Sequence, residues 1–283
     1  MKLQPTIKFT AKDARVNIVI PSDLDHKYSR GVLGVIAGSA QYPGAAVLVC
    51  SAAMNTGVGM VRFNSSSGLS HMVLHKSPEV VVQPGKVSAW LLGPGIQSQK
   101  YSHFSTWLRH RWFKLARLQS VPTVLDAGAL YLAGQLPQPT LITPHAGELA
   151  VLLKDRGVTT SAEAIEGDPK KRIRFAADSL NVVVLLKGST TYVADSKRIL
   201  ELPKATPWLA TAGTGDVLAG IIGSLVATHE VEILNDSSYL ADLAATGAFI
   251  HNRAAELASG GGPLSASSLL EKIPTAITNI LKR

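Results

Sequence analysis

Short apolar runs alternate along this chain with longer segments in which apolar residues recur at helical spacing. Apolar runs of about four to eight residues that end at glycine or a polar residue are typical of buried strands, and longer amphipathic segments are typical of helices. We expect strands at residues 32–37, 60–63, 72–74, 80–82, 89–92, 121–125, 141–143, 181–186 and 191–193. We expect helices at residues 43–55, 101–118, 148–154, 217–228, 239–257 and 266–281.

The alternation of strands and helices predicts an α/β fold, with a central, mainly parallel sheet and helices on both of its faces. The strand at residues 191–193 follows the one at 181–186 so closely that we expect it to return as a hairpin. The sequence contains no internal repeat and no long linker. We therefore expect a single domain over residues 1–283.

The composition favours a folded globular protein. Apolar residues make up 46% of the chain and charged residues 17%, which excludes an intrinsically disordered chain. The single cysteine, Cys50, excludes a disulfide framework within the chain and a multi-cysteine zinc site, and its apolar neighbours predict a buried thiol. No segment resembles a secretory signal, and no uninterrupted apolar stretch is long enough to span a bilayer. We expect a cytoplasmic protein without a membrane partner.

The formal net charge is +8, and basic residues cluster at residues 109–117 and 170–174. Such clusters can bind nucleic acid, but no nucleic-acid-binding motif accompanies these two. We therefore expect solvated helix faces and no nucleic-acid partner. A positive field of this kind can also attract small polyanions such as nucleotides.

Several common catalytic signatures are missing from the sequence. The phosphate loop of P-loop proteins is absent. Gly213 and Gly215 begin like a dinucleotide fingerprint, but Leu218 stands where the third glycine belongs. The zinc-protease and esterase motifs are also absent. The sequence therefore does not support a typical dehydrogenase, zinc protease or esterase.

The strongest candidate for an anion site is the segment in which Gly213 and Gly215 flank Thr214 just before an apolar helix. The backbone N–H groups of such a turn, together with the positive end of the helix dipole, can hold a phosphate. The carboxylate of Asp216 lies at the same helix start. An N-cap role would explain Asp216 alone but would not require the two glycines, so we favour a functional site.

Other polar residues follow predicted strands, and open α/β sheets bind ligands at the carboxyl ends of their strands. Lys187 and the hydroxyl residues after it can hold phosphate or ribose, or they form an ordinary hairpin turn. His145 and Glu148 can contact a ligand, or they cap the next helix. The glycines of residues 93–95 can admit a ligand to the backbone, or they form a plain turn. Asp126 has a similar alternative role as a helix cap.

A longer set of residues carries a family resemblance. The set comprises Lys27, Arg30, Gly31, Gly38, Ser39, Tyr42, Pro43, Gly44, Ala45, Gly93, Pro94, Gly95, Asp126, Thr143, Pro144, His145, Gly147, Glu148, Lys187, Gly188, Thr191 and residues 213–220. In this order the set resembles the ADP/ATP-dependent NAD(P)H-hydrate dehydratases, a branch of the ribokinase-like superfamily. The sequence departs from the family at Gly128, where Asp or a similar polar residue is expected. Many members carry an N-terminal epimerase domain, and because only 26 residues precede Lys27 we expect any epimerase partner to be a separate chain.

The resemblance implies a reaction that repairs a nicotinamide cofactor. In this family ADP (or ATP) donates a phosphoryl group to the hydroxyl of the S-form of NAD(P)H hydrate. Phosphate then leaves, which regenerates NADH or NADPH and releases AMP (or ADP). The resemblance also implies a Mg²⁺ ion that bridges phosphates, for which we assign no protein ligand, and a homotetramer.

The resemblance and the chemistry together suggest roles for individual residues. Asp216 is the expected base that removes the hydroxyl proton, and the N–H groups of Gly213 and Gly215 are expected to stabilise charge on the transferred phosphoryl group. The expected nucleotide site comprises Lys187, Gly188, Ser189, Thr190, Thr191 and Gly215. The expected site of the hydrated cofactor comprises Ala45, Gly95, His145 and Asp216. We expect the nucleotide between residues 187–191 and the helix start, with His145 and Gly95 across the crevice.

Other functions remain open. A ribokinase-like kinase of hydroxymethylpyrimidine or hydroxyethylthiazole would keep Asp216 and the glycines but would leave the phosphate on its product. A nucleotide-binding regulator without turnover would not need a carboxylate aimed at the anion site. A basic nucleic-acid-binding protein would bind DNA or RNA with a steep salt dependence.

Overall fold

The computed structural model describes residues 5–97 and 104–282, so the first residues of the helix expected at 101–118 lie outside the described residues. The strands are β1 (Thr6–Lys8), β2 (Val32–Ile36), β3 (Met60–Phe63), β4 (Ala89–Leu92), β5 (Thr123–Leu125), β6 (Thr140–Ile142), β7 (Val183–Leu186), β8 (Tyr192–Ala194) and β9 (Ile199–Glu201). The helices are α1 (Ala11–Val16), α2 (Pro43–Thr56), α3 (Ser67–Lys76), α4 (Phe104–Ala116), α5 (Ala146–Lys154), α6 (Ala162–Gly167), α7 (Pro169–Leu180), α8 (Thr214–Thr228), α9 (Glu230–Asn235), α10 (Tyr239–Ser259) and α11 (Ala266–Leu281). Two short 3-10 helices are η1 (Ala127–Leu132) and η2 (Pro207–Leu209).

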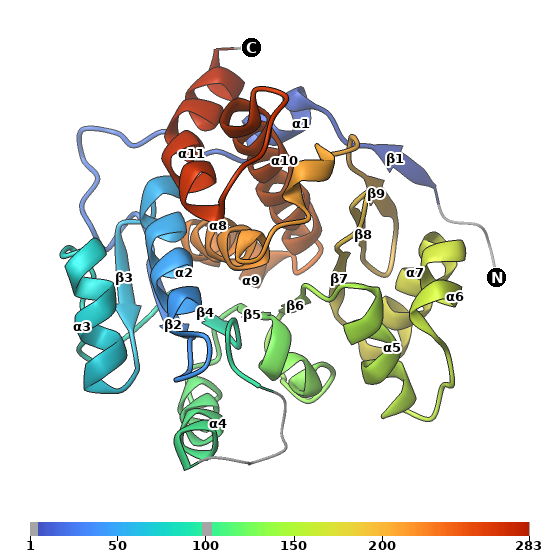
Figure 1. The fold of residues 1–283 in the computed structure, drawn as a ribbon, viewed down its shortest axis with the longest axis horizontal. Coiled ribbons are helices and arrows are strands. Elements are labelled where there is room, and N and C mark those ends of the chain that lie inside the picture. Colours follow the sequence, from blue (N-terminus) through green and yellow to red (C-terminus); the bar gives the residue numbers. More distant parts are fainter. Residues whose placement is uncertain (1–4, 98–103, 283) are drawn as a thin grey trace.

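The strands form one sheet in the order β1-β9-β8-β7-β6-β5-β4-β2-β3 (Figure 1). All neighbouring strands are parallel except at β8, which runs antiparallel to both β7 and β9. The predicted mainly parallel sheet and the hairpin return after β7 are therefore confirmed. Strands β7, β6, β5, β4 and β2 lie side by side, so their carboxyl ends meet along one edge of the sheet.

Helices cover both faces of the sheet, as predicted (Figure 1). Successive side chains of a strand point to opposite faces, and β2 places Leu33 and Val35 in one core but Val32 and Ile36 in the other. The first core includes side chains from α2, α8, α10 and α11, and the second includes side chains from α4, α5 and α7. Burial on both faces explains why these strands are continuous apolar runs in the sequence.

Two of the predicted strands are wrong. Residues 72–74 lie in α3, where Leu69 and Val73 are buried on the inner face of the helix. Residues 80–82 contribute only a single bridge, between Val81 and Arg62. Three apolar residues in a row do not distinguish a strand from one buried turn of a helix, which accounts for the error at residues 72–74.

The sequence pattern also missed several elements, including β1, β9, α6 and α7. All three side chains of β1 are exposed, so this strand leaves no alternation of apolar and polar positions. Helices α6 and α7 are rich in charged residues, and few of their side chains reach the core. Pairing with strands far along the chain forms β1 and β9, which a local pattern does not record. Helix α7 does carry buried residues at helical spacing, at Ile173, Ala176, Ala177 and Leu180, and the sequence analysis did not use that pattern.

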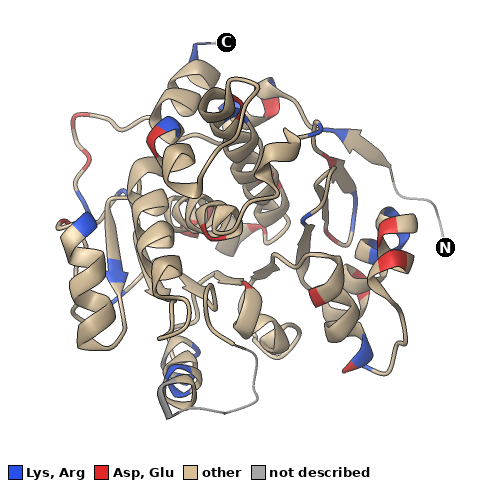
Figure 2. Cartoon of the chain, viewed as in Figure 1, with Lys and Arg blue, Asp and Glu red and all other residues tan. Residues whose placement is uncertain are grey.

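The two basic clusters lie on α4 and α7 (Figure 2), and their members differ in exposure. On α7 the expected solvated face holds for Lys171, which is exposed, but Lys170 pairs with Glu201 at 2.7 Å, and the side chain of Arg174 is 13% exposed and pairs with Asp178. The prediction is wrong for part of α4, because Arg109 and His110 are only 3% and 4% exposed. His110 lies 3.1 Å from Tyr131 Oη and 3.1 Å from the carbonyl oxygen of Gln97, which draws this side of α4 inward.

The cysteine and the membrane predictions can also be compared with the structure. Cys50 is buried, as predicted, and burial raises the pKa of its thiol. No helix in the described ranges combines the length and the apolar character that crossing a bilayer requires.

Candidate active site

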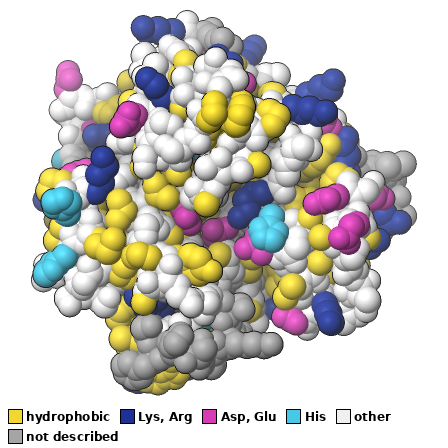
Figure 3. Space-filling model, viewed as in Figure 1, with side chains coloured by type: hydrophobic (Ala, Val, Ile, Leu, Met, Phe, Trp, Pro, Cys, Tyr) yellow, Lys and Arg dark blue, Asp and Glu magenta, His cyan; other side chains and the backbone are white. Residues whose placement is uncertain are grey.

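The polar residues singled out in the sequence gather at the carboxyl ends of neighbouring strands. Asp126 directly follows β5, His145 lies shortly after β6, and Lys187 directly follows β7. Strands β5, β6 and β7 are adjacent in the sheet. A mixed cluster of acidic, basic and histidine side chains is visible near the middle of the face drawn in Figure 3.

Helix α8 begins beside these strand ends with a fixed glycine turn. Gly213 is the N-cap, and its φ of 88° is a left-handed conformation that residues with a side chain rarely adopt. A Cβ at Gly213 would also lie 2.7 Å from Cδ1 of Leu48. Thr214 Oγ1 shares its hydrogen between the carbonyl oxygens of Leu209 and Thr211, at 2.9 and 2.8 Å. Conformation, packing and hydrogen bonding therefore hold the turn in one shape.

Asp216 lies in the first turn of α8 but is not its N-cap, so the helix-cap interpretation of Asp216 is wrong. The first hydrogen bond along the helix joins Val217 N–H to the carbonyl oxygen of Gly213 at 3.2 Å. Within the described residues, the N–H groups of Gly215 and Asp216 have no protein acceptor. A Cβ at Gly215 would meet only Nζ of Lys187, at 3.9 Å. Two unpaired donors therefore border open space next to an ammonium group.

Lys187 is held among carboxylates. Its Nζ lies 3.0 Å from Oδ1 of Asp126 and 3.7 Å from Oε2 of Glu148. Thr143 Oγ1 donates to the same Oδ1 of Asp126 at 2.7 Å. Burial opposes the charge on Lys187, but Asp126 and Glu148 outweigh it and raise the pKa of the ammonium, so Lys187 is charged at neutral pH.

Asp126 binds other side chains and does not cap a helix, which was its alternative role in the sequence analysis. It stands at the N-cap position of η1, but its side chain makes no capping hydrogen bond there. The capping alternative is wrong for its side chain, which is 5% exposed and binds Lys187 and Thr143 instead. Two signals in the sequence pointed to Asp126, which are its position directly after a buried strand and its place in the family resemblance.

Asp216 has an unusual acidity for a carboxyl group. Burial and the negative charge of Asp126 raise its pKa to about 7, while Lys187 opposes the rise. A carboxylate with a pKa near neutrality exchanges its proton readily at physiological pH, which suits a general base. The side chain is partly buried, and the free N–H groups of the same helical turn lie next to it.

His145 occupies the N-cap of α5. Its Nδ1 accepts hydrogen bonds from the N–H groups of Gly147 and Glu148 at 3.1 and 3.3 Å, and Glu148 Oε2 accepts from His145 N–H at 2.9 Å. The capping alternative is thus confirmed for this pair. The side chain of His145 is still 59% exposed and can meet a ligand with its outer edge.

The expected position of His145 relative to Lys187 is wrong. The two residues form a parallel bridge, and Lys187 N–H donates to the carbonyl oxygen of Pro144 at 2.9 Å. Strands β6 and β7 are neighbours, so their carboxyl ends lie together and not across a crevice. The sequence places both residues after strands but does not give the order of the strands in the sheet.

The loops after β2 and β4 meet at the other end of this edge. A Cβ at Gly95 would lie 2.4 Å from Cβ of Ala45, and Gly38 N–H donates to the carbonyl oxygen of Pro94 at 2.8 Å. Ala45 and Gly95 therefore lie together, as predicted, and β5 separates their strands from His145. Packing explains why position 128 is glycine and not the polar residue that the family resemblance predicts. A Cβ there would lie 2.4 Å from the carbonyl oxygen of Ile96.

The turn of residues 187–191 joins β7 to β8. Gly188 and Ser189 are exposed, and Thr191 is 9% exposed. The turn borders a hollow of about 370 Å³, which Ala146 and Glu166 also line. Lys187, the first residue of this turn, lies next to the start of α8. The hollow beside the turn is also lined by residues of α6 and α7.

A buried histidine that the sequence analysis did not single out also reaches α8. Nε2 of His251, on α10, lies 2.9 Å from the carbonyl oxygen of Thr214. The residue is 6% exposed, and burial lowers its pKa to about 4. Asn252 and Arg253 follow it directly in the sequence, so no local pattern distinguishes His251 from its polar neighbours.

The carboxylates can assist a metal ion but do not form a complete site. In the ranges that the structure describes, no three His, Cys, Asp or Glu side chains form a group that could hold a metal ion by itself. Asp126, Glu148 and Asp216 all act electrostatically on Lys187. One or two such carboxylates fit Mg²⁺ when the phosphates of a nucleotide supply its other ligands.

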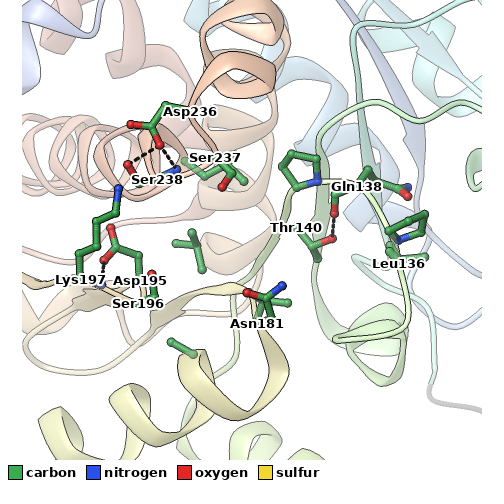
Figure 4. A pocket seen from close by; sticks show the side chains of 16 residues that line it. Leu136, Gln138, Thr140, Asn181, Asp195, Ser196, Lys197, Asp236, Ser237 and Ser238 are labelled. Atoms are coloured by element: carbon green, nitrogen blue, oxygen red, sulfur yellow. Dashed lines mark hydrogen bonds between the residues drawn. The ribbon is translucent and has the colours of Figure 1, made fainter. Parts of the chain in front are cut away.

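A second hollow, of about 240 Å³, lies at the opposite ends of β6 and β7 (Figure 4). Several of its polar groups bond to one another or to the adjacent backbone, and Oε1 of Gln138 is buried without a hydrogen-bond partner among the described residues. Asp236 Oδ1 accepts from Ser238 Oγ at 2.7 Å, and Asp195 Oδ1 accepts from Lys197 N–H at 2.6 Å. It has no counterpart of the unpaired N–H groups and raised carboxyl pKa at the start of α8, so the chemistry is better supported at the carboxyl ends.

Comparison with known proteins adds a family to this geometry. A family model for NAD(P)H-hydrate dehydratases matches residues 33–275. A bifunctional NAD(P)H-hydrate repair enzyme of Mycobacterium tuberculosis is 39% identical over 235 residues, which cover 78% of this chain and 46% of that protein. An ADP-dependent (S)-NAD(P)H-hydrate dehydratase of Xanthomonas campestris is 29% identical, over 93% of this chain and 92% of that protein. The chain spans about half the length of the bifunctional relatives that it matches.

Solved structures confirm the fold. An ADP/ATP-dependent NAD(P)H-hydrate dehydratase of Bacillus subtilis, co-crystallized with ATP and Mg²⁺, superposes with a TM-score of 0.83 at 23% identity, over 97% of this chain and 99% of that one. A ribokinase-like superfamily protein of Enterococcus faecalis superposes with a TM-score of 0.82 at 19% identity, over 100% of this chain and 99% of that one. The predicted ribokinase-like fold is therefore confirmed.

Proposed function

Since the chain belongs to the NAD(P)H-hydrate dehydratase family, we propose that it catalyses the ADP- (or ATP-) dependent dehydration of the S-form of NAD(P)H hydrate. The products are NADH or NADPH, phosphate, and AMP (or ADP). The single observation that carries this proposal is the start of α8. There, a carboxyl group with a pKa of about 7 lies beside unpaired N–H groups and the ammonium of Lys187.

In the first step the hydroxyl oxygen of the hydrated ring attacks the terminal phosphorus of the nucleotide. Asp216 takes the hydroxyl proton as the new O–P bond forms and the bond to the leaving AMP (or ADP) breaks. The raised pKa makes Asp216 a stronger base than an ordinary aspartate once it has lost its proton. The side chain therefore has the acidity that this proton transfer needs.

The protein stabilises the transferred phosphoryl group through donors that are already in place. The N–H groups of Gly215 and Asp216 point out of the first helical turn, and the positive end of the helix dipole adds to them. We therefore shift the donor role proposed for Gly213 to its neighbours, and Gly213 supplies the turn. Lys187 adds a positive charge next to these donors. When Mg²⁺ is bound, it neutralises charge on the phosphates, with Asp126 or Glu148 within reach.

In the second step the C–O bond to the phosphorylated ring carbon breaks and phosphate leaves with the bonding electrons. The ring nitrogen supplies electron density to that carbon, and a proton then leaves the adjacent carbon to restore the double bond. The overall change converts hydrate and ADP into NADH, AMP and phosphate. Donors that stabilised the phosphoryl group also stabilise the departing phosphate.

The remaining predicted residues form two halves of a binding site. We assign the hydrated cofactor to the wall of Ala45 and Gly95 and to the exposed edge of His145. We assign the nucleotide to Lys187, to the turn of Gly188, Ser189, Thr190 and Thr191, and to Gly215. The 3.9 Å approach of Lys187 to the Cβ position of Gly215 supports a phosphate at the junction of the two halves.

The direct test is incubation of the purified protein with hydrated NADH and ADP. We expect the absorbance of dihydronicotinamide to return and free phosphate to appear in equal amounts. A kinase of hydroxymethylpyrimidine or hydroxyethylthiazole would instead phosphorylate those alcohols and release no phosphate. Asp216→Asn serves as the inactive control. Stable phosphorylated product without free phosphate would overturn the dehydratase proposal.

A homotetramer, a cytoplasmic location and a separate epimerase partner stay predictions. The family resemblance supports the homotetramer, and light scattering after size-exclusion chromatography tests it. A mass of one or two subunits would contradict it. A pull-down with the chain as bait, followed by an epimerase assay on the R-form of the hydrate, tests the partner.

A further inference from the structure

His251 is a buried polar group that the proposed mechanism has not used. It lies on α10, and its Nε2 is 2.9 Å from the carbonyl oxygen of Thr214 in the first turn of α8. A carbonyl oxygen can only accept a hydrogen bond, so Nε2 must carry the hydrogen. Burial keeps the ring neutral near pH 7, which fixes the tautomer with its hydrogen on Nε2.

The acceptor of this hydrogen bond belongs to an important peptide group. The carbonyl of Thr214 and the N–H of Gly215 are parts of the same planar unit and point in opposite directions. In a helix the carbonyl points along the axis toward the C-terminus, so the Gly215 N–H points out of the N-terminus, and Nζ of Lys187 lies 3.9 Å from the Cβ position of the same residue. The orientation of one group therefore sets the orientation of the other.

We propose that His251 is a positioning residue, which holds the Thr214–Gly215 peptide so that the Gly215 N–H faces the transferred phosphoryl group. This inference rests on the proposed function for its catalytic consequence. The peptide lies in the first turn of α8, and the hydrogen bond from His251 adds a second constraint to the one that the helix supplies, at a position where glycine allows more freedom than any other residue. It also polarises the peptide group, which strengthens the N–H as a donor.

The chain offers a matched control at the other end of the same helix. Nδ1 of His229 lies 2.8 Å from the carbonyl oxygen of Leu225, and the side chain is 3% exposed. Burial lowers the pKa of His229, so it too is held as a neutral donor. His229 thus has the same burial and the same kind of bond, but it lies fourteen residues beyond Gly215, near the end of α8.

The test compares His251→Leu, His251→Gln and His229→Leu. Leucine keeps the bulk but has no donor, whereas glutamine can place an amide N–H close to the position of Nε2. We expect His251→Leu to lower kcat at least about tenfold, since losing a whole donor of this kind costs ~10²–10³-fold. AMP, which lacks the transferred group, should bind as in the parent protein. His251→Gln should recover most of kcat, and His229→Leu should lower Tm without lowering kcat.

A second readout does not depend on turnover. With ¹⁵N-glycine labelling, the amide resonance of Gly215 should move in His251→Leu, return toward its original position in His251→Gln and stay in place in His229→Leu. An unchanged Gly215 resonance in His251→Leu would overturn the proposal, as would equal loss of kcat in the leucine and glutamine variants. If the parent protein fails to dehydrate the hydrate, the proposed function fails, and the Gly215 resonance still decides the positioning role.

Discussion

The two ends of helix α8 are held in similar ways but surrounded differently. At each end a buried histidine meets a backbone carbonyl, His251 at the start and His229 at the end. At the end, His229 also lies 3.0 Å from Thr228 Oγ1 and packs edge-on against Tyr239. At the start, two N–H groups in the described chain have no protein acceptor, and a carboxyl group has a raised pKa.

The difference teaches which interactions serve stability and which serve chemistry. A helix end whose polar groups are satisfied contributes to folding. A helix start that keeps donors unpaired and a carboxylate partly buried loses stability, because both are more favourable in water. The start of α8 has these unfavourable features together, and they are the features that phosphoryl transfer requires.

The largest expected effect comes from Asp216→Asn, which should reduce the dehydration rate at least ~10²-fold because the general base is lost. The pKa of about 7 for Asp216 in the folded protein lies above the ordinary value of an aspartate, 3.8, so ionisation destabilises the fold. The stability penalty is absent below pH 4 and complete above pH 7. The Tm of Asp216→Asn should therefore exceed that of the parent protein by more at pH 8 than at pH 5. Near-normal turnover in this variant would eliminate Asp216 as the base.

Lys187→Met should follow, with a rate loss of about tenfold or more, because a charge next to the phosphoryl group is removed. Lys187 lowers the pKa of Asp216, so the acid limb of the pH profile of kcat/KM should move to higher pH. Lys197→Met, on the exposed turn at the opposite edge of the sheet, is the matched control. A pH profile that stays in place would show that Lys187 does not act on the base.

Gly213 and Gly215 should separate stability from catalysis. Gly213→Ala forces a side chain into a φ of 88° and against Leu48, so unfolding free energy should fall by more than ~1 kcal/mol. Gly215→Ala has room for its Cβ and gains about 0.5–1 kcal/mol of helix preference, yet the methyl group enters the site beside Lys187. Chemical denaturation and turnover distinguish them. Parallel losses of stability and rate in both variants would remove the distinction.

The smallest effect on activity is expected for His229→Leu. Loss of its hydrogen bond leaves the Leu225 carbonyl with one partner fewer and should lower the unfolding free energy by about 1 kcal/mol. The turnover of the folded protein should stay within about twofold of the parent, since a packing change far from the active site acts independently of it. A large fall in kcat would show that the end of α8 is coupled to its start.

The apolar pattern of the sequence predicted most of the central sheet and the long helices. Strands such as β2, β4 and β7 are buried on both faces, so each appears in the sequence as a continuous apolar run that can be recognised locally. β1 is exposed and pairs with β9 nearly two hundred residues later, and nothing local records that pairing.

The candidate site was predictable where a motif carries its own geometry. The glycine turn before Asp216 is local, so its helix start could be derived from the sequence. The contact of Lys187 with Asp126 and the bond from His251 to Thr214 join residues 61 and 37 positions apart. Strand order and helix packing bring these groups together, so no local pattern could predict them.

The most direct measurement of the central claim is the product balance of a single reaction. The protein is incubated with hydrated NADH and limiting ADP, and NADH, AMP and inorganic phosphate are measured together. Dehydration by way of a phosphorylated intermediate predicts one NADH and one phosphate for each AMP formed, with none of the three in Asp216→Asn. AMP formation without NADH, or NADH formation without ADP consumption, would contradict the account.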